Sequence, residues 1–316
     1  MGQIGKFHCI ICVFLVLFLL LNAYFVFSKE KEVSVSQPRN LSLLDPTIAH
    51  MNMDSFLEKK SEFIASYVPL KKEIQNILST ADGKFGVYFE DLEFHSWTGI
   101  NERELFKPAS LLKTTTVASI LKEVEEGELS LNSEVKLNKD DLNYRFGDLY
   151  EKEGETVTIK DLIEIALVHS DNTAIKTLHT FMPHERWVET RLAMGLPIVS
   201  IEESENGTVL TPKEFSNIFR SLYFSGYLCR ASSNWILSLL SQTDFEEGIP
   251  AGVPQNVKVA HKVGVWASEG SMHDCGIVYA ENPYLLCIMS EDTTQEEGNR
   301  VIKEISKTVY DYVSSH

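Results

Sequence analysis

The sequence predicts an α/β fold of the α+β type: an antiparallel five-stranded sheet flanked by terminal helices, with an inserted all-helical lobe. Three observations predict it. Strand-like segments fall into two groups far apart in the chain, helical patterns fill the region between them, and helical patterns also occupy both ends of the folded region. One sheet built from both groups of strands is the most economical arrangement. The 316 residues and a 44% apolar share allow a sizeable core.

The N-terminal residues are expected to lie outside this fold. An apolar run from Cys9 to Phe27 is close to the ~20 residues that a membrane-spanning helix needs. We expect residues 1–28 to be an uncleaved membrane anchor, with a cleaved signal peptide and secretion as the alternative. Residues 29–53 are polar and are expected to form a linker. The predicted location is therefore the cell membrane, single-pass, with residues 54–316 outside the cytoplasm.

The folded region opens with helices and a hairpin. Helical segments are plausible over Phe56–Tyr67 and Lys71–Leu78, with Pro69 between them. Two aromatic and β-branched segments follow, Phe85–Glu90 and Phe94–Thr98, and a short turn joins them. This pattern predicts a β-hairpin.

The next helix, predicted over Phe106–Leu121 and ending near Gly127, is apolar nearly all round. Such a helix belongs in the middle of a domain. Ser110 and Lys113 nevertheless share one side of it. An unpaired ammonium in these surroundings is costly, so Lys113 is expected either to reach solvent or to have a function.

Helices fill the middle of the chain, after a region that shows no strand character. Capping boxes open two of them, and Gly or polar residues end the others. The expected helices begin at Thr158–Asp161 and Thr211–Glu214 and cover about Thr173–Phe181, His184–Met194 and Ser233–Ser241.

The last third returns to strands. They are expected over Val257–Trp266, Ser271–Ala280 and Tyr284–Ser290, and an amphipathic helix with Val301, Ile302, Ile305, Val309, Tyr310 and Val313 on one side closes the chain. The helical lobe would span about residues 107–212, inserted in an α/β lobe of residues 54–106 and 213–316. The junctions of the two lobes would frame a cleft, and the helix with Ser110 starts at one of them.

Charge and residue spacing exclude some functions. The net charge of −16 argues against nucleic acid as a partner, because phosphate binding needs a basic surface. His169, His261, His273 and Asp274 lack metal-ligand spacing, so we expect no metal and no cofactor.

The cysteines do not form a disulfide framework. Cys9 and Cys12 lie in the apolar run, and an odd number, Cys229, Cys275 and Cys287, remains. The last two fall on what look like two strands of one hairpin. The sequence favours buried reduced thiols.

Three short motifs carry the chemistry. Ser110-Leu-Leu-Lys113 is S-x-x-K, Ser170-Asp171-Asn172 is S-D-N, and Lys262-Val263-Gly264 differs from K-T-G by one residue. Each motif alone is a weak signal, but their order, spacing and predicted positions agree. From about Asp54 to its end, the chain resembles the penicillin-recognising serine hydrolases, and most closely the class A β-lactamase-like branch.

The motif residues suit acyl transfer. Ser110 at a helix N-terminus would be the nucleophile, and its backbone N–H can help to bind an oxyanion. Lys113 can accept the serine proton once it is neutral, because burial and a second cation, Lys262, lower its pKa. Ser170 would relay a proton to the leaving nitrogen.

Substrate contacts follow from the second and third motifs. Asn172 offers an amide to the substrate, and Gly264 lets the strand approach it closely. The resemblance implies that the N–H of Val265 completes the oxyanion hole. Val263 departs from the family's Thr or Ser, whose hydroxyl contacts the substrate carboxylate in relatives, so binding of β-lactams or D-Ala-D-Ala-like termini is expected to be weak or the natural ligand to differ.

The sequence identifies residues for hydrolysis of the acyl-enzyme less clearly than residues for its formation. Class A β-lactamases carry a loop Glu that activates water, and the segment between Gly195 and Thr211 resembles a shorter version of that loop. The Glu-x-x-x-Asn pattern of that loop is present only loosely, from Glu202 to Asn206. We assign none of Glu202, Glu203 and Glu205 to the catalytic Glu, and an acidic surface loop explains them more simply. Fast β-lactam turnover is therefore not predicted.

The sequence predicts an extracytoplasmic serine hydrolase that forms an acyl-enzyme on Ser110 with β-lactam-like or cell-wall peptide amide substrates. One alternative is a true class A β-lactamase with atypical deacylation. The other is a non-catalytic protein that binds peptidoglycan peptides. The presence of Lys113 and Lys262 together with both serines favours the enzyme, because a binding protein does not need a buried lysine.

Overall fold

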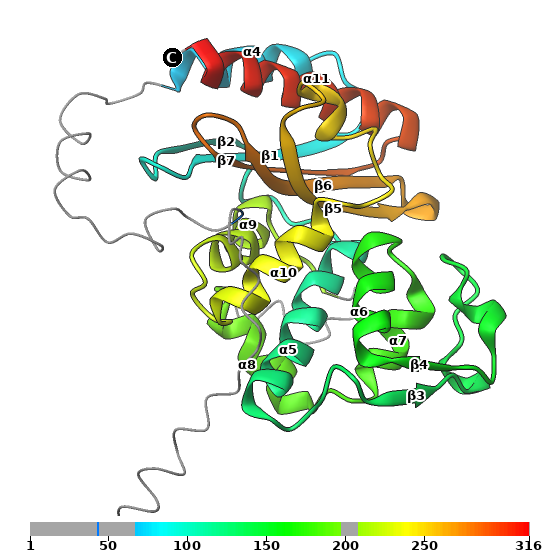
Figure 1. Cartoon of the computed structure of the whole chain (residues 1–316). Coiled ribbons are helices and arrows are strands. Elements are labelled where there is room, and N and C mark those ends of the chain that lie inside the picture. Colours follow the sequence, from blue (N-terminus) through cyan, green and yellow to red (C-terminus); the bar gives the residue numbers. More distant parts are fainter. Residues whose placement is uncertain (1–42, 44–66, 197–207, 316) are drawn as a thin grey trace, which may run out of the picture. The chain divides into compact units, whose positions relative to one another are not determined.

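The computed structural model describes Leu43, residues 67–196 and residues 208–315 (Figure 1). The predicted anchor, the predicted linker apart from Leu43, all but the end of the helix predicted over Phe56–Tyr67, and the acidic loop with Glu202 lie outside these residues. Within the described part of the chain, no helix is long and apolar enough to span a membrane.

A five-stranded antiparallel sheet organises the molecule. Its strands are β1 (Lys84–Asp91), β2 (Trp97–Ile100), β5 (Lys258–Trp266), β6 (Ser271–Tyr279) and β7 (Tyr284–Glu291). The order β2-β1-β7-β6-β5 joins the first hairpin to the last three strands, as predicted. Strand β5, which carries the third motif, lies at the edge of the sheet.

Two terminal helices cover one face of the sheet, as predicted (Figure 1). They are α4 (Val68–Leu78) and α11 (Gln295–Ser315). Helix α4 begins at Val68 rather than at the predicted Lys71, and Pro69 lies in its first turn, where its missing N–H costs nothing. The two helices and the sheet share one hydrophobic cluster, to which Leu70, Ile74, Phe89, Ile288, Val301 and Ile305 belong.

Helices α9 (Pro212–Tyr223) and α10 (Arg230–Leu240) pack on the other face of the sheet (Figure 1). The remaining helices pack against α10 or against one another: α5 (Lys113–Glu126), α6 (Ile159–Val168), α7 (Asn172–His179) and α8 (His184–Ala193). Side chains of α5, α6, α9 and α10 share a second hydrophobic cluster with the sheet, including Ile120, Leu162, Phe215, Leu237 and Ile277. This cluster contains residues from both sides of the predicted lobe boundary near residue 212. The division of the chain into two lobes stays a prediction.

The region after Gly127 contains a small hairpin that the sequence did not predict. Strands β3 (Glu134–Lys136) and β4 (Thr156–Thr158) pair as a separate two-stranded sheet. Three-residue strands are too short to show an alternating pattern. The capping boxes at Thr158 and Thr211 form as predicted and open α6 and α9.

Cys275 and Cys287 form a disulfide bond. The expectation of reduced thiols is wrong for these two residues, because the register of β6 and β7 pairs them directly across the sheet. Paired residues of antiparallel strands lie on the same face, so their sulfur atoms meet. Cys229 is a free, exposed thiol.

Candidate active site

Ser110 lies in a short 3₁₀ turn, Ala109–Leu112, and α5 begins at Lys113 directly after it. The continuous helix predicted over Phe106–Leu121 is therefore divided into a tight turn and an α-helix. Ala109 adopts a left-handed conformation with a φ of 48°. Such a backbone is unfavourable for a non-glycine residue, and its position immediately before Ser110 is typical of a functional site.

The ammonium groups of two buried lysines converge on Ser170. Lys113 Nζ donates to Ser170 Oγ at 3.2 Å, to Asn172 Oδ1 at 2.8 Å, and to the Ser170 carbonyl. Lys262 Nζ donates to the same Oγ at 2.8 Å and to the Val263 carbonyl at 3.0 Å. The structure thus brings together residues of all three predicted motifs.

Burial shifts the pKa of both lysines downward. Desolvation lowers the pKa of Lys113 to about 8, and the nearby Asp171 carboxylate opposes this shift. Desolvation also lowers the pKa of Lys262 well below its ordinary value, and the Lys113 charge lowers it further. A lysine with a lowered pKa can exist as the neutral amine that a proton acceptor requires.

Ser170 is held between two helices in a strained backbone conformation. It follows α6 with a φ of 55°, which is left-handed. Asp171 then caps α7, since its Oδ1 accepts from Ala174 N–H at 2.8 Å, and its Oδ2 accepts from Leu149 N–H at 2.9 Å. A side chain at Gly147 would collide with that carboxylate. Asp171 therefore fixes the turn that presents Ser170.

Strand alternation sends the residues of the third motif to opposite faces of β5. Lys262 points toward Ser170. Val263 belongs to the cluster beneath the sheet with α4 and α11, and Val265 packs against that cluster. Val263 thus fills a core position, which suits an apolar side chain. The role of the Val265 N–H in an oxyanion hole stays a prediction.

Gly264 allows β5 to pack closely against the nucleophile turn. A Cβ atom at this position would lie 2.8 Å from the Pro108 carbonyl oxygen and 3.0 Å from Leu111 Cγ. The sequence predicted a close approach of Gly264 to the substrate. The structure describes a close contact of Gly264 with the turn that carries Ser110, and its approach to the substrate stays a prediction.

His273 attaches the sheet to the segment before Ser110. Its Nδ1 accepts from the Ser290 backbone N–H at 3.0 Å, so the ring proton lies on Nε2, which donates to the Lys107 carbonyl at 2.8 Å. Burial lowers the pKa of His273 to about 4, which keeps the ring neutral. No local sequence pattern indicates this role of His273, because it depends on the register of β6 and β7.

Two other histidines, His261 and His169, lie beside carboxylates. His261 Nδ1 lies 2.7 Å from Asp274 Oδ1, and its Nε2 lies 3.0 Å from Thr243 Oγ1. His169 Nδ1 lies 2.6 Å from Asp244 Oδ2. Over residues 67–196 and 208–315, no group of three or more His, Cys, Asp or Glu side chains could hold a metal ion.

Two aromatic residues that the sequence did not single out border the lysine pair. Lys262 Nζ lies 5.6 Å from the centroid of the Phe245 ring, and Phe146 stacks on Phe245 at 6.0 Å. These residues lie in different loops, and no local pattern marks such a contact.

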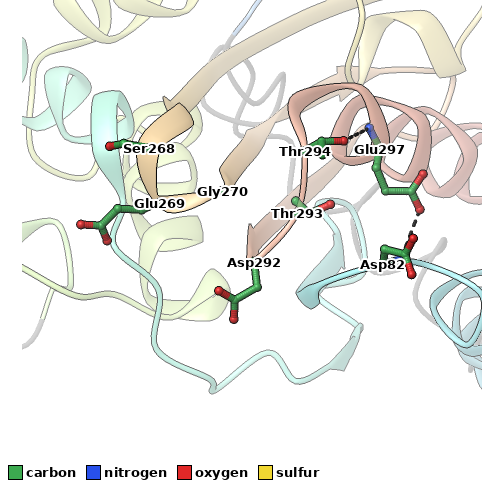
Figure 2. Close-up of a pocket in the computed structure, with 8 residues that line it drawn as sticks. All are labelled: Asp82, Ser268, Glu269, Gly270, Asp292, Thr293, Thr294 and Glu297. Atoms are coloured by element: carbon green, nitrogen blue, oxygen red, sulfur yellow. Dashed lines mark hydrogen bonds between the residues drawn. The ribbon is translucent and has the colours of Figure 1, made fainter.

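A cavity of about 450 Å³ lies apart from the motif residues. Figure 2 shows the side chains that line it: Asp82, Ser268, Glu269, Gly270, Asp292, Thr293, Thr294 and Glu297. The predicted site residues are not among them. The cavity is open and acidic, and two of its carboxylates already pair with neighbours, Glu269 with Lys107 and Glu297 with Arg300.

The sequence and the fold match known proteins. The sequence profile described as the Beta-lactamase enzyme family matches residues 69–313. Beta-lactamase SME-1 of Serratia marcescens is 24% identical over 263 residues, which cover 75% of this chain and 86% of that protein. Beta-lactamase PSE-4 of Pseudomonas aeruginosa is 24% identical over 294 residues, which cover 87% of this chain and 96% of that protein.

Solved structures share the fold. The structure of PBP-A matches with a TM-score of 0.71 and 20% identity, covering 79% of this chain and 97% of that one. A PBP-A variant described as an acyl-enzyme complex with penicillin-G matches with a TM-score of 0.70 and 19% identity, covering 78% of this chain and 96% of that one. Because the family profile spans more than half of the sequence, the chain belongs to the Beta-lactamase enzyme family and is a serine hydrolase of the β-lactamase type.

Proposed function

We propose that the protein forms an acyl-enzyme on Ser110 with β-lactam-like or cell-wall peptide amide substrates. The observation that carries this proposal is Ser170 Oγ, which accepts hydrogen bonds from Lys113 at 3.2 Å and from Lys262 at 2.8 Å. A hydroxyl between two amines can receive a proton from one side and pass its own to the other. Acyl transfer from an amide needs such a route, because the leaving nitrogen must be protonated.

The proposed reaction begins with neutral Lys113. Its Nζ accepts the Ser110 proton while Oγ attacks the amide carbonyl carbon. The C–N bond then breaks as the nitrogen receives a proton from Ser170 Oγ, which takes one in turn from the lysine pair. The products are an ester on Ser110 and the free amine. Asn172 Oδ1, held by Lys113 at 2.8 Å, leaves its amide N–H groups to face the substrate.

The names of the relatives support the substrate class. The matching proteins include β-lactamases, and one matching structure is described as a penicillin-G acyl-enzyme. The acidic loop with Glu202, Glu203 and Glu205 lies outside the described residues. The proposal therefore specifies formation of the acyl-enzyme and leaves a β-lactamase with atypical deacylation as the alternative.

We propose an extracytoplasmic location, with residues 1–28 as a membrane anchor. The apolar run from Cys9 to Phe27 supports it. The Cys275–Cys287 disulfide is consistent with it, since such bonds persist mainly in oxidising compartments. Protease treatment of intact cells tests the proposal, because an extracytoplasmic domain is digested from outside and a cytoplasmic domain is protected.

One experiment tests the reaction. The soluble part of the chain is incubated with a fluorescent penicillin, and its intact mass is followed over time. We expect a covalent adduct that persists in the wild type and is absent in Ser110→Ala. Rapid turnover with little adduct would favour the β-lactamase alternative. No adduct with any β-lactam or ester would exclude acylation by these substrates and favour a binding protein.

A further inference from the structure

Leu43 is the only residue of the predicted linker, residues 29–53, that the structure describes, and it packs against the folded body. Its side chain is 5% exposed and belongs to the hydrophobic cluster that α9 and α10 share with the sheet. Burial of a leucine removes apolar surface from water and stabilises the contact. This point of the linker is therefore part of the core of the body.

Two side chains of the body bind the backbone of Leu43. Tyr279 Oη donates to the Leu43 carbonyl at 2.6 Å. The Leu43 N–H donates to Asn234 Oδ1 at 3.4 Å, which is a longer and weaker contact. A buried peptide group needs hydrogen-bond partners within the protein. Leu43 finds a partner for both of its backbone groups on the body.

The residues that bind Leu43 come from α10 and the end of β6. Asn234 lies in the second turn of α10 and is 6% exposed, and Tyr279 is the last residue of β6. The Tyr279 ring lies 6.4 Å from the ring of Tyr223, the last residue of α9. Burial and the nearby Tyr223 raise the pKa of Tyr279 well above its ordinary value, so its hydroxyl remains a donor. These residues are not part of the three sequence motifs, and the contact is separate from the acylation chemistry.

We propose that Leu43 is a clasp that holds the linker on the body at Asn234 and Tyr279. The membrane tether then ends at residue 43 instead of at α4. This role rests on the proposed anchor at residues 1–28. Fully extended, residues 29–43 span at most about 50 Å, whereas residues 29–67 would span about 130 Å. The clasp therefore restricts how far Ser110 moves from the bilayer.

Release of the clasp lengthens the tether and leaves the fold intact. The contact consists of one apolar side chain and two hydrogen bonds from side chains of the body. No strand or helix of the described residues includes Leu43, so its departure breaks no sheet or helix hydrogen bond. The tether thus has a short form with Leu43 bound and a long form with Leu43 released.

The first test is hydrogen exchange of the Leu43 amide, measured residue by residue on the full chain in detergent. Protection is the ratio of the rate in an unstructured chain to the observed rate. We expect Leu43→Ala to lower it about tenfold or more, because most of the buried apolar surface is lost. Tyr279→Phe keeps the ring but loses the hydrogen bond, and should lower protection about fivefold. Leu43→Met keeps the side-chain size and should match the wild type.

Two variants at exposed positions serve as matched controls. Leu192→Ala removes a leucine side chain that is 41% exposed, and Tyr144→Phe removes a hydroxyl from a side chain that is 66% exposed. Both should leave the protection of the Leu43 amide unchanged. Thermal unfolding verifies that every variant is folded.

The second test measures the distance between the body and the bilayer. Cys229, a free and exposed thiol, carries a donor fluorophore in a chain in which Cys9 and Cys12 are replaced with Ser. The chain is inserted in vesicles whose lipid headgroups carry an acceptor. We expect a loss of energy transfer in Leu43→Ala, because the tether is longer, and wild-type transfer in Leu192→Ala.

The two tests separate the clasp from the anchor. Weaker protection in Leu43→Ala and Tyr279→Phe, with no energy transfer in any protein, would support the clasp and contradict the proposed anchor. Weaker protection with unchanged transfer would overturn the role of the clasp in setting the tether length. Equal protection in the wild type and both variants, or exchange in the wild type at the rate of an unstructured chain, would overturn the clasp itself.

Discussion

Lys262 Nζ lies 2.8 Å from Ser170 Oγ, and this contact joins residues 92 positions apart in the sequence. It connects the edge strand of the sheet to the break between α6 and α7. The ammonium group of Lys262 donates to two neutral oxygen atoms, Ser170 Oγ and the Val263 carbonyl oxygen. Burial lowers the pKa of Lys262, the Lys113 charge lowers it further, and Asp274 opposes the shift, so the lysine can exchange a proton with the serine.

Replacing Ser170 with Ala should slow acylation by about 10²–10⁴-fold, the usual effect of losing a group that transfers protons. Both lysines would lose a shared acceptor, while the backbone contact of Lys113 to residue 170 would remain. Stopped-flow acylation with the fluorescent penicillin measures the effect. Ser314→Ala, at the exposed end of α11, is the control. Acylation of Ser170→Ala at the wild-type rate would show that protons travel by another route.

The acylation rate should rise with pH through about 8. Lys113 must be neutral to accept the Ser110 proton, and burial lowers its pKa to about 8. Below that pH most of the lysine is charged, so the rate should fall about tenfold per pH unit well below the pKa. The measurement is the second-order acylation rate between pH 6 and 9. A flat profile would argue against Lys113 as the base.

The free energy of unfolding should also increase with pH above about 8. Lys113 is charged in both states below its folded pKa of about 8, and it loses its proton in the folded state before the unfolded state does, near 10.5. Between these values the unfolded chain binds more protons, so stability rises, by at most about 1.4 kcal/mol per pH unit for one group. Urea denaturation at pH 7.5 and 9.5 measures it. In Lys113→Met the free energy of unfolding should increase less with pH. Some increase should remain, because Lys262 also has a lowered pKa.

The sequence was sufficient to predict the five-stranded sheet, the terminal helices and the three motifs, because periodicity, capping boxes and short spacings are local. Contacts that depend on strand register were not predictable. Cys275 meets Cys287, and His273 reaches the Lys107 carbonyl, only because of how β6 pairs with its neighbours. The stacking of Phe146 on Phe245 requires two loops to meet in space. The strands β3 and β4 were not predicted, because a three-residue segment is too short to show an alternation of apolar and polar side chains.

The soluble part of the chain should react with a thiol reagent at one site before reduction and at three sites after reduction in denaturant. Cys229 is free and exposed, whereas Cys275 and Cys287 are bonded and fully buried. Alkylation followed by intact mass measurement counts the sites. Cys287→Ser should lower the free energy of unfolding by about 2–4 kcal/mol, the usual contribution of a disulfide, while Cys229→Ser should have no effect. Three reactive thiols in the unreduced, denatured chain would show that the bond is absent.

Gly264→Ala should impair acylation and stability together, because the new methyl group would lie 2.8 Å from the Pro108 carbonyl oxygen and 3.0 Å from Leu111 Cγ. The turn that carries Ser110 would have to move away from β5. Overpacking of this kind typically costs about 1–3 kcal/mol, and the displaced nucleophile should acylate at least tenfold more slowly. Gly226→Ala is the matched control, since its nearest neighbour would lie at 3.7 Å, an ordinary contact. Urea denaturation and the acylation rate are measured on both variants. A Gly264→Ala protein that retains wild-type stability and rate would mean that the turn and the strand are free to separate, and that close packing at Gly264 does not position Ser110.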